Sequence, residues 1–285
     1  MPTTWGDLVR RAIDALTAAG YDNAVREARW LLREVTGAER TWQRLLDETP
    51  DESALGRFET MVARRVAGEP LQYVIGHWPF RSLELLVDDR ALIPRPETEQ
   101  VVEVALAELD ALGVDEPSVI DLGTGSGALA LTIAVERPRA RVLGIESSEA
   151  ALDLAMENRD RVGLGVERVA LARGSWFAKL PAGLRGTVDL IVTNPPYVAT
   201  DDVLDEVVRA WEPAGALFAG DDGLDDLRVI IAESPAWLSG NGVLVAEIGA
   251  TQAEAVVDLA TTAGFATVEV RRDLAGRDRV LVARR

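Results

Sequence analysis

The residues best suited to chemistry in this sequence are Asn194, Pro195, Pro196 and Tyr197. They follow the run 188–192, whose apolar and β-branched residues predict a buried strand. Two consecutive prolines cannot continue a strand ladder, and each holds the residue before it in an extended conformation. Asn194 is therefore expected to lie rigidly at the carboxyl end of a central strand, where open α/β sheets bind their ligands.

A carboxamide, a proline carbonyl and an aromatic ring at one point can hold a planar NH2 group. Asn194 and the Pro195 carbonyl offer two hydrogen-bond acceptors for its two hydrogens, and the Tyr197 ring offers a face. Taken alone, these residues are equally compatible with an ordinary proline-rich turn after a strand. The glycine-rich loop upstream favours the first interpretation.

That loop lies between a predicted strand and a predicted helix. The apolar run 118–122 leads into Gly123, Gly125 and Gly127, and residues 128–134 are helical in character. Glycines let the backbone turn sharply and approach a ligand without a Cβ in the way. The loop is of nucleotide-binding type, but its G-x-G-x-G spacing is not the dinucleotide fingerprint, and the lysine of a phosphate-binding loop is missing.

A second predicted strand, 141–146, ends in the carboxylate of Glu146, about 20 residues beyond the glycines. At that spacing an acidic residue binds ribose hydroxyls, because a carboxylate offers two acceptors to a vicinal diol. A solvated strand end beside a tight turn is the structural alternative. The order of strand, loop, helix, strand and acid favours an adenosine-bearing ligand that does not require a pyrophosphate.

Together these motifs resemble the class I S-adenosylmethionine-dependent methyltransferases that act on an amide or amino nitrogen. Further stretches narrow the resemblance to the HemK/PrmC family, and they are found at 68–73, 92–99, 212–213, 222–224 and 273–279. The I-P-R-P-E-T-E sequence at 93–99 is the most discriminating of them. Members of that family methylate the glutamine of the Gly-Gly-Gln motif in class I peptide chain release factors.

The resemblance implies a role for each site residue, with S-adenosylmethionine as the donor and S-adenosylhomocysteine as its product. Catalytic roles fall on Asn194, Pro195 and Tyr197, and Pro196 joins them in substrate binding. Asn194 also contacts the cofactor, together with Asp121, Leu122, Gly123, Thr124 and Gly125 at its methionine part, Glu146 at its ribose and Trp176 at its adenine. Ser175 stands where the family usually has Asp, and Glu146 replaces a commoner Asp.

Three alternatives remain open. The glutamine could belong to a ribosomal protein, although the stretch 93–99 favours a release factor. The Asn-Pro-Pro-Tyr motif also occurs in adenine-specific DNA methyltransferases, whose catalytic half should be basic. A non-catalytic cofactor-binding protein would not need this motif intact.

Composition bears on these alternatives. The formal net charge is −17, of which −2 falls on residues 1–75 and −15 on the rest. Nucleic-acid binding depends on Lys and Arg neutralising phosphates, so we expect no nucleic-acid partner. The acidic catalytic half could steer a basic protein surface, or could simply promote solubility. The partner we expect is a class I release factor.

Residue usage also limits the chemistry and the location. Cysteine is absent and histidine occurs once, so disulfides and thiolate catalysis are ruled out and we expect no metal site. No apolar run reaches the length of a membrane span, and no signal peptide is evident at the start. We expect a cytoplasmic monomer without membrane association.

The chain divides into three predicted segments. Residues 1–70 form a helical substrate-recognition domain, 71–94 a β-hairpin linker and 95–285 the methyltransferase domain. A capping pair, Thr4 with Asp7, should begin the first helix. Asn23 and Pro50-Asp51 should begin the second and fourth helices.

Two further expectations concern the linker and the helix after it. Residues 73–76 and 83–87 look like the paired strands of the hairpin. Pro96 suits the first turn of a helix, and Arg95 before it could pair with a carboxylate or contact substrate.

The remainder predicts an α/β domain with a mostly parallel, seven-stranded, Rossmann-like sheet. Strands are expected at 118–123, 141–146, 166–172, 188–193, 242–249, 267–270 and 279–282. The last two have no helix between them, so they must pair antiparallel if adjacent. The resemblance implies a sheet of seven strands with one reversed, and this pattern agrees with it.

Overall fold

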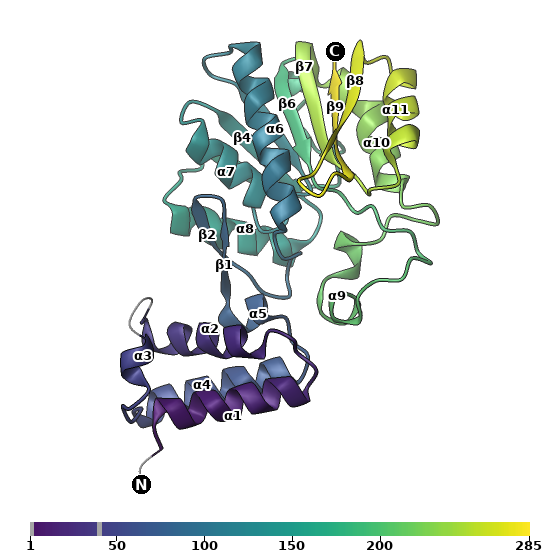
Figure 1. The fold of residues 1–285 in the computed structure, drawn as a ribbon. Helices are drawn as coiled ribbons and strands as arrows, with labels where there is room; N and C mark the ends of the chain where they lie inside the picture. Colours follow the sequence, from purple (N-terminus) through teal and green to yellow (C-terminus); the bar gives the residue numbers. More distant parts are fainter. Residues whose placement is uncertain (1–2, 39–41) are drawn as a thin grey trace. The chain divides into compact units, whose positions relative to one another are not determined.

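The computed structural model describes residues 3–38 and 42–285 (Figure 1). Its internal contacts divide the chain into two compact units, one ending at His77 and the other beginning at Trp78. The separate roles predicted for the segments 1–70, 71–94 and 95–285 stay predictions. No helix in the described ranges is both long and apolar enough to cross a membrane.

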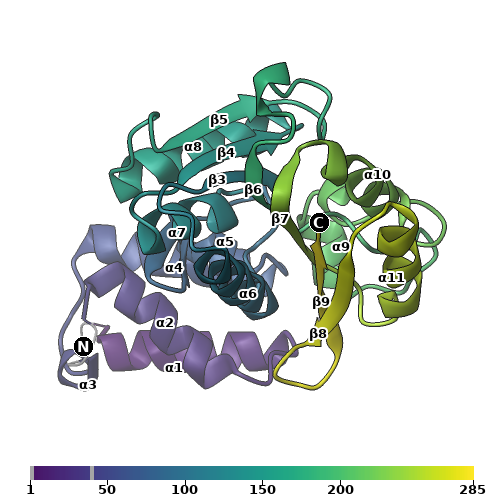
Figure 2. The ribbon, with the colours of Figure 1, turned by 90° about the horizontal axis from the view of Figure 1, so that it is seen from above.

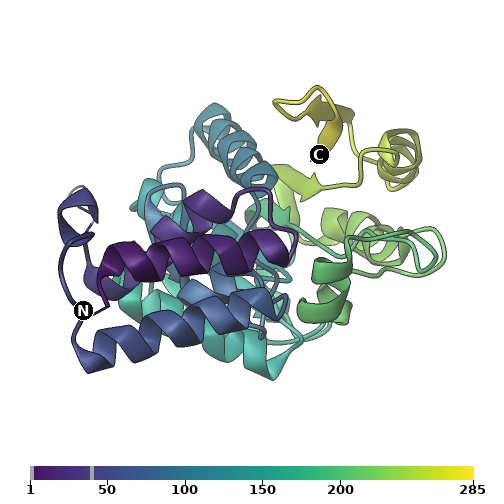
Figure 3. The same cartoon turned by 60° about the horizontal axis from the view of Figure 1, so that its bottom comes forward.

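The first unit is helical. Its helices are α1 (Trp5–Ala18), α2 (Ala24–Thr36), α3 (Trp42–Leu45), α4 (Glu52–Val66) and α5 (Leu71–Ile75). Figure 3, in which these helices are purple to blue, shows the long ones side by side. The predicted capping box of Thr4 and Asp7 is present, and Asp51 caps α4. Asn23 precedes α2 without a side-chain capping bond.

One stretch of this unit differs from the sequence-based expectation. Residues 73–76 do not form a strand: they belong to α5 and its end, where Gly76 adopts a left-handed conformation with φ 86°. Pro70 precedes the helix, and its carbonyl accepts a bond from Val74 N at 3.0 Å. A short apolar run fits a strand or a helix equally well, and here the flanking proline and glycine decide for the helix.

The hairpin therefore begins later, with β1 (His77–Phe80) and β2 (Leu83–Leu86). Arg81 forms its turn with a positive φ of 49°. The Arg81 guanidinium donates to both carboxylate oxygens of Glu136, at 2.6 and 2.8 Å, and its backbone N–H donates to Glu99 at 2.9 Å. The turn is thus tied to two helices of the larger domain.

The second unit alternates strands and helices after the hairpin (Figure 2). Its strands are β3 (Ser118–Leu122), β4 (Arg141–Glu146), β5 (Val169–Arg173), β6 (Val188–Thr193), β7 (Leu238–Glu247), β8 (Thr267–Arg272) and β9 (Asp278–Arg284). Its helices are α6 (Pro96–Leu112), α7 (Ala128–Glu136), α8 (Glu149–Val162), α9 (Glu206–Trp211), α10 (Asp225–Glu233) and α11 (Ala253–Thr262). Short 3-10 turns occupy Ala182–Leu184, Ala214–Ala216 and Ser234–Ala236.

The seven strands form one sheet in the order β5-β4-β3-β6-β7-β9-β8. All neighbouring pairs from β5 to β7 are parallel, and β9 runs antiparallel to both β7 and β8. This confirms the predicted mostly parallel seven-stranded sheet with one reversed strand. From β3 the chain first adds β4 and β5 toward one edge of the sheet, and then crosses back to add β6 and β7 on the other side of β3. The strand order therefore reverses between β3 and β6, which is the topological switch point.

Successive side chains of each strand point to opposite faces of the sheet, and they build one apolar layer on each face. In β3, Val119 packs in the layer with α6 and α7, while Ile120 packs in the layer with α10 and α11. The neighbouring strands repeat this pattern, as expected for a sheet covered on both faces by helices. The covered sheet holds the carboxyl ends of β3, β4 and β6 at one rigid edge.

Candidate active site

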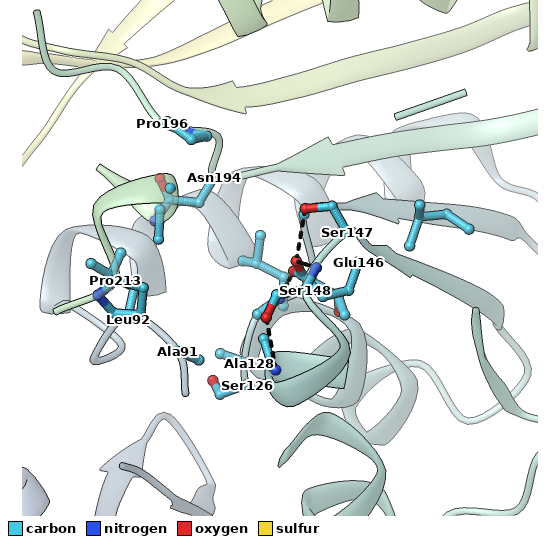
Figure 4. A pocket seen from close by; sticks show the side chains of 18 of the residues that line it. Ala91, Leu92, Ser126, Ala128, Glu146, Ser147, Ser148, Asn194, Pro196 and Pro213 are labelled. Atoms are coloured by element: carbon cyan, nitrogen blue, oxygen red, sulfur yellow. Dashed lines mark hydrogen bonds between the residues drawn. The ribbon is translucent and has the colours of Figure 1, made fainter. Parts of the chain in front are cut away.

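A cavity of about 470 Å³ lies at that edge. It is lined by the loops that follow β3, β4, β5 and β6, by the segment before α6 and by the turn after α9. Figure 4 shows Glu146, Ser147 and Ser148 on one side of it and Asn194 and Pro196 on another. A volume of this size suits a small organic ligand.

The glycine-rich loop forms the floor of the cavity where the sequence predicted a ligand. Gly123 and Gly125 adopt left-handed conformations, with φ 71° and 55°. A Cβ on Gly123 would come within 3.3 Å of the Trp176 ring, whereas a Cβ on Gly125 would meet nothing within 4 Å. The first glycine therefore permits close packing against the indole, and the second leaves backbone open to the cavity.

Asp121 supports this loop from below. Its Oδ2 accepts hydrogen bonds from the Thr124 hydroxyl at 2.6 Å and from Ala130 N at 3.1 Å. Its Oδ1 is buried without a hydrogen-bond partner among the described residues. Burial raises the pKa of this carboxyl to about 7, against the lowering effect of these two bonds. Asp121 and Leu122 do not line the cavity, so their predicted contacts with the cofactor stay predictions.

Glu146 joins two loops at the cavity wall. Its Oε2 accepts from Gly125 N at 2.9 Å, and its Oε1 accepts from Ser148 N at 2.8 Å and from the Ser147 hydroxyl at 3.3 Å. These bonds fix the carboxylate between the ends of β3 and β4. Oε2 keeps one free lone pair, and Oε1 gains one when the rotatable Ser147 hydroxyl turns away, so Glu146 can offer acceptors to a ligand diol.

Trp176 stands at another wall in a strained conformation. Its φ of 46° is unusual for a bulky residue, and such strain persists where the surroundings hold it. The indole Nε1–H donates to Asp226 Oδ1 at 3.1 Å, and both side chains line the cavity. Ser175 also lines the cavity and is exposed. Burial raises the pKa of Asp226.

Asn194 follows the last residue of β6, as the sequence predicts, and lines the same cavity. Its Nδ2 donates to the Thr98 hydroxyl at 3.2 Å. Thr98 lies in the first turn of α6, and its hydroxyl donates to Glu247 Oε2 at 2.7 Å. Glu247 ends β7 and is buried, and burial raises its pKa.

The rest of the Asn-Pro-Pro-Tyr turn divides between the cavity and the core. Pro196 lines the cavity, while Pro195 is buried and does not, so the contact of its carbonyl with a substrate stays a prediction. The Tyr197 hydroxyl donates to Glu247 Oε1 at 3.2 Å, and its ring packs with the apolar layer of α10 and α11. Tyr197 does not line the cavity, and its stacking on a substrate stays a prediction.

The segment before α6 completes the wall. Arg95 pairs with Glu212, and the Ile93 N–H donates to the same carboxylate at 3.2 Å. Glu212 is buried, and Pro213 after it lines the cavity together with Pro94. The pair thus joins two motif-bearing stretches that are distant in sequence. Of the two roles considered for Arg95, pairing with a carboxylate is the one observed.

Solved structures share this fold at low sequence identity. The T. thermophilus 16S rRNA N2 G1207 methyltransferase RsmC, solved with AdoMet and guanosine, is 21% identical with a TM-score of 0.53. The match covers 73% of this chain and 49% of that one. The hMettl16 catalytic domain, solved with the MAT2A 3′UTR hairpin 6, is 14% identical with a TM-score of 0.55, covering 82% and 81%. The fold is that of the class I methyltransferases.

Comparison of sequences identifies the family. Residues 7–76 match the PrmC N-terminal domain, and residues 114–242 match a methyltransferase domain. Release factor glutamine methyltransferases from Cereibacter sphaeroides and Xylella fastidiosa are each 43% identical, covering 98% and 95% of this chain and 97% of each relative. The Geobacter sulfurreducens protein of the same name is 38% identical over 99% of this chain and 98% of its own length. The chain belongs to the release factor glutamine methyltransferase family, as the motif resemblance indicated.

Four residues of the site are missing from the sequence-based prediction: Thr98, Glu247, Asp226 and Asn158. Asn158 is buried in α8 and donates to the Ser126 carbonyl at 2.9 Å and to the Leu86 carbonyl at 3.1 Å. Thr98 lies inside the discriminating stretch 93–99, and Glu247 is an acidic residue near the end of the predicted apolar strand 242–249; these are the signals that could have identified them.

Proposed function

We propose that this enzyme transfers a methyl group from S-adenosylmethionine to the side-chain amide nitrogen of a glutamine. The substrate is the glutamine of the Gly-Gly-Gln motif in class I peptide chain release factors. Family membership supports the reaction, and the names of the relatives support the protein substrate. The observation that carries the proposal is that Asn194 lines one cavity together with Glu146 and the loop of Gly123 and Gly125.

The residues present fit the cofactor. A volume of about 470 Å³ suits a ligand of its size. Glu146 Oε2 can accept from one ribose hydroxyl, and Oε1 from a second one that replaces the Ser147 hydroxyl. Gly125 lets the backbone approach a methionine group closely, and Trp176 supplies an aromatic face for adenine. When bound, S-adenosylmethionine supplies an electrophilic methyl group on a sulfonium.

The protein's own contribution is to orient a poor nucleophile. The lone pair of a glutamine amide nitrogen is delocalised into its carbonyl. In the proposed mechanism, Asn194 Oδ1 and the Pro195 carbonyl accept the two N–H hydrogens and turn the nitrogen lone pair toward the methyl group. These bonds strengthen as positive charge develops, so they favour the transition state over the ground state. Most of the acceleration then comes from positioning.

Proton abstraction before methyl transfer is not part of this mechanism. Burial raises the pKa of Tyr197, so its phenol stays protonated at neutral pH. Glu247 lies outside the cavity, and both of its carboxylate oxygens already accept hydrogen bonds, from Thr98 and Tyr197. After the methyl group has arrived, the nitrogen is cationic and at its most acidic, and it loses one proton to solvent water to give the neutral N-methyl amide.

The experiment is a labelled methyl-transfer assay with a purified class I release factor. It is repeated with the same factor carrying a replacement of the Gly-Gly-Gln glutamine, and with a preparation of ribosomal proteins. Label on the intact factor and none on the altered one is the expected result. Label that persists on the altered factor, or that appears only on a ribosomal protein, would show that the substrate is different.

The proposal includes the setting of the reaction. A release factor substrate is consistent with a cytoplasmic monomer that does not bind nucleic acid directly. The net charge of −15 on the residues after 75 opposes a DNA substrate, because phosphate binding requires basic residues. A methylation assay with duplex DNA is the matching negative control.

A further inference from the structure

A chain of two hydrogen bonds connects Asn194 to a buried carboxylate. Asn194 Nδ2 donates to Thr98 Oγ1 at 3.2 Å, and Thr98 Oγ1 donates to Glu247 Oε2 at 2.7 Å. The side chains come from the ends of β6 and β7 and the first turn of α6. Thr98 is 3% exposed and Glu247 1% exposed, so the bond between them is shielded from water, while Asn194 is half-buried at the cavity wall.

The sheet register puts Asn194 and Glu247, the two ends of this series of hydrogen bonds, side by side. Thr193 is paired with Ala246 across the parallel strands β6 and β7. The next residues along each strand are Asn194 and Glu247, which therefore lie at the same level of the sheet edge. Thr98 bridges them from the first turn of α6, and the geometry is set by three regular elements rather than by a loop.

The direction of the two bonds follows from the number of hydrogens available. A threonine hydroxyl has one hydrogen, and here it is donated to the Glu247 carboxylate. The Thr98 oxygen can then only accept from Asn194, so it must face the NH2 end of the amide. If the amide were flipped, its Oδ1 would face another oxygen with no hydrogen between them, which is repulsive.

We infer that Thr98 and Glu247 are positioning residues that fix the amide orientation of Asn194, so that its Oδ1 faces the substrate. This inference rests on the proposed function, in which that oxygen accepts a hydrogen from the substrate nitrogen. A flipped Asn194 amide would turn its own NH2 toward the NH2 of the substrate glutamine and would remove Oδ1 as the acceptor. Neither Thr98 nor Glu247 needs to touch the reacting atoms for this role.

The charge of Glu247 also has counterparts in the core. Arg279 is buried nearby, donates to the Ile248 carbonyl at 2.9 Å and favours the ionised form of Glu247. The Tyr197 hydroxyl donates to the second carboxylate oxygen of Glu247. A buried carboxylate is costly unless its oxygens are paired, and both are paired here. The same carboxylate thus holds the first and last residues of the Asn-Pro-Pro-Tyr turn.

The test compares three threonine variants of the full chain. Thr98→Val keeps the side-chain shape and removes the hydroxyl, whereas Thr98→Ser keeps the hydroxyl. Thr132→Val is the matched control, because Thr132 is also fully buried in a helix but its hydroxyl has no hydrogen-bond partner among the described residues. Each variant is assayed for methyl transfer to the release factor and for S-adenosylhomocysteine binding by calorimetry.

In Thr98→Val the Asn194 NH2 loses its buried partner, and flipping toward the open cavity becomes favourable. We expect kcat to fall about 10- to 100-fold, as is typical of a buried donor that loses its acceptor. KM for the release factor and the affinity for S-adenosylhomocysteine should each stay within about twofold. Thr98→Ser should recover kcat to within about threefold of the wild type, and Thr132→Val should match the wild type.

A second readout does not depend on turnover. The side-chain NH2 resonances of Asn194, assigned in the ¹H–¹⁵N spectrum by their loss in Asn194→Asp, report the environment of that group. They should shift and exchange faster with solvent in Thr98→Val and stay near wild-type positions in Thr98→Ser. Unchanged resonances with wild-type kcat in Thr98→Val would overturn the inference, as would an equal loss of kcat in Thr98→Val and Thr132→Val.

The two proposals fail in different ways. If the wild-type enzyme leaves the release factor unlabelled, the proposed function is wrong, while the resonances still report whether Thr98 holds the Asn194 amide. If the wild type labels the factor and Thr98→Val does so at the same rate, the positioning role is wrong and the proposed function stands.

Discussion

The hydroxyl of Tyr197 donates a hydrogen bond to Glu247 Oε1 at 3.2 Å, on the side of the Asn-Pro-Pro-Tyr turn that faces the core. The backbone of the same residue is also held, since its carbonyl accepts from Gln252 Nε2 at 3.0 Å. Gln252 also donates to the Gly223 carbonyl at 3.0 Å. Tyr197 therefore anchors the end of the turn, whatever its ring contributes to substrate binding.

Two substitutions at Tyr197 distinguish the role of its hydroxyl from the role of its ring. Tyr197→Phe removes one buried hydrogen bond and should lower the free energy of unfolding by about 1 kcal/mol, measured by urea denaturation. Because the phenyl ring remains, kcat should stay within about threefold of the wild type. Tyr197→Leu removes the ring as well, and kcat should fall at least about tenfold if the ring supports the substrate amide or the turn.

The comparison of the two variants is decisive. An equal loss of kcat in Tyr197→Phe and Tyr197→Leu would assign the effect to the hydroxyl and its bond to Glu247. Cofactor affinity, measured by calorimetry, should be unchanged in both, because Tyr197 does not line the cavity.

Asn194→Asp should cause a large loss of turnover, of the order of 100-fold in kcat. A carboxylate at this position would place a second acceptor beside Thr98, whose single hydrogen is already donated to Glu247. It would also put a negative charge beside the sulfonium and near Glu247. The measurement is single-turnover methyl transfer at saturating cofactor, and turnover at the wild-type rate would contradict the role of Asn194.

Asp226 should support cofactor binding through Trp176. Asp226→Ala removes the acceptor of the indole N–H, and the indole in its strained backbone conformation should become less ordered. We expect S-adenosylhomocysteine to bind about three- to tenfold more weakly by calorimetry, in line with the loss of one hydrogen bond.

Its neighbour provides the control. Asp225→Ala changes the same turn of α10, but Asp225 is exposed and pairs with Arg228 at 3.0 Å on the surface. Affinity in this variant should equal that of the wild type. If the two alanine variants weaken binding equally, the effect belongs to the helix terminus and the bond to Trp176 has no special role.

The sequence predicted those parts of the site that are formed by local patterns. The loop from Asp121 to Gly127, the acid at Glu146 and the turn at Asn194 each combine a strand end with residues whose backbone preferences are strong. Their order along the chain, combined with the rules for parallel sheets, places them at one edge. The observed strands β3, β4 and β6 bring Glu146, Gly125 and Asn194 to one cavity.

The remaining parts depend on contacts between distant residues. Thr98 and Glu247 are separated by 149 positions, and no pattern in the sequence indicates that their side chains are in contact. The sequence predicts a strand where α5 forms, because Tyr73, Val74 and Ile75 fit both structures. Tertiary placement also decides which side of a motif faces the ligand, as the inward-turned carboxylate of Asp121 and the anchored hydroxyl of Tyr197 show.

Asp121 provides a test of electrostatics in the fold. Its carboxyl is fully buried, and burial raises its pKa from 3.8 to about 7. Between these two values the unfolded chain is ionised at this residue while the folded protein holds a proton. The folded state then binds more protons, so the contribution of Asp121 to stability is greatest below about pH 4 and is lost as the pH rises to about 7.

Asp121→Asn removes this titration while retaining an oxygen that can accept from Thr124 and Ala130. The free energy of unfolding of the variant, relative to the wild type, should therefore increase between pH 4 and pH 8. At 1.36 kcal/mol per pKa unit, the shift sets an upper limit of about 4 kcal/mol on this increase. Urea denaturation at a series of pH values measures it. If the difference in free energy of unfolding between the two proteins does not vary with pH, Asp121 has an ordinary pKa. Another group then compensates the charge of its buried carboxylate.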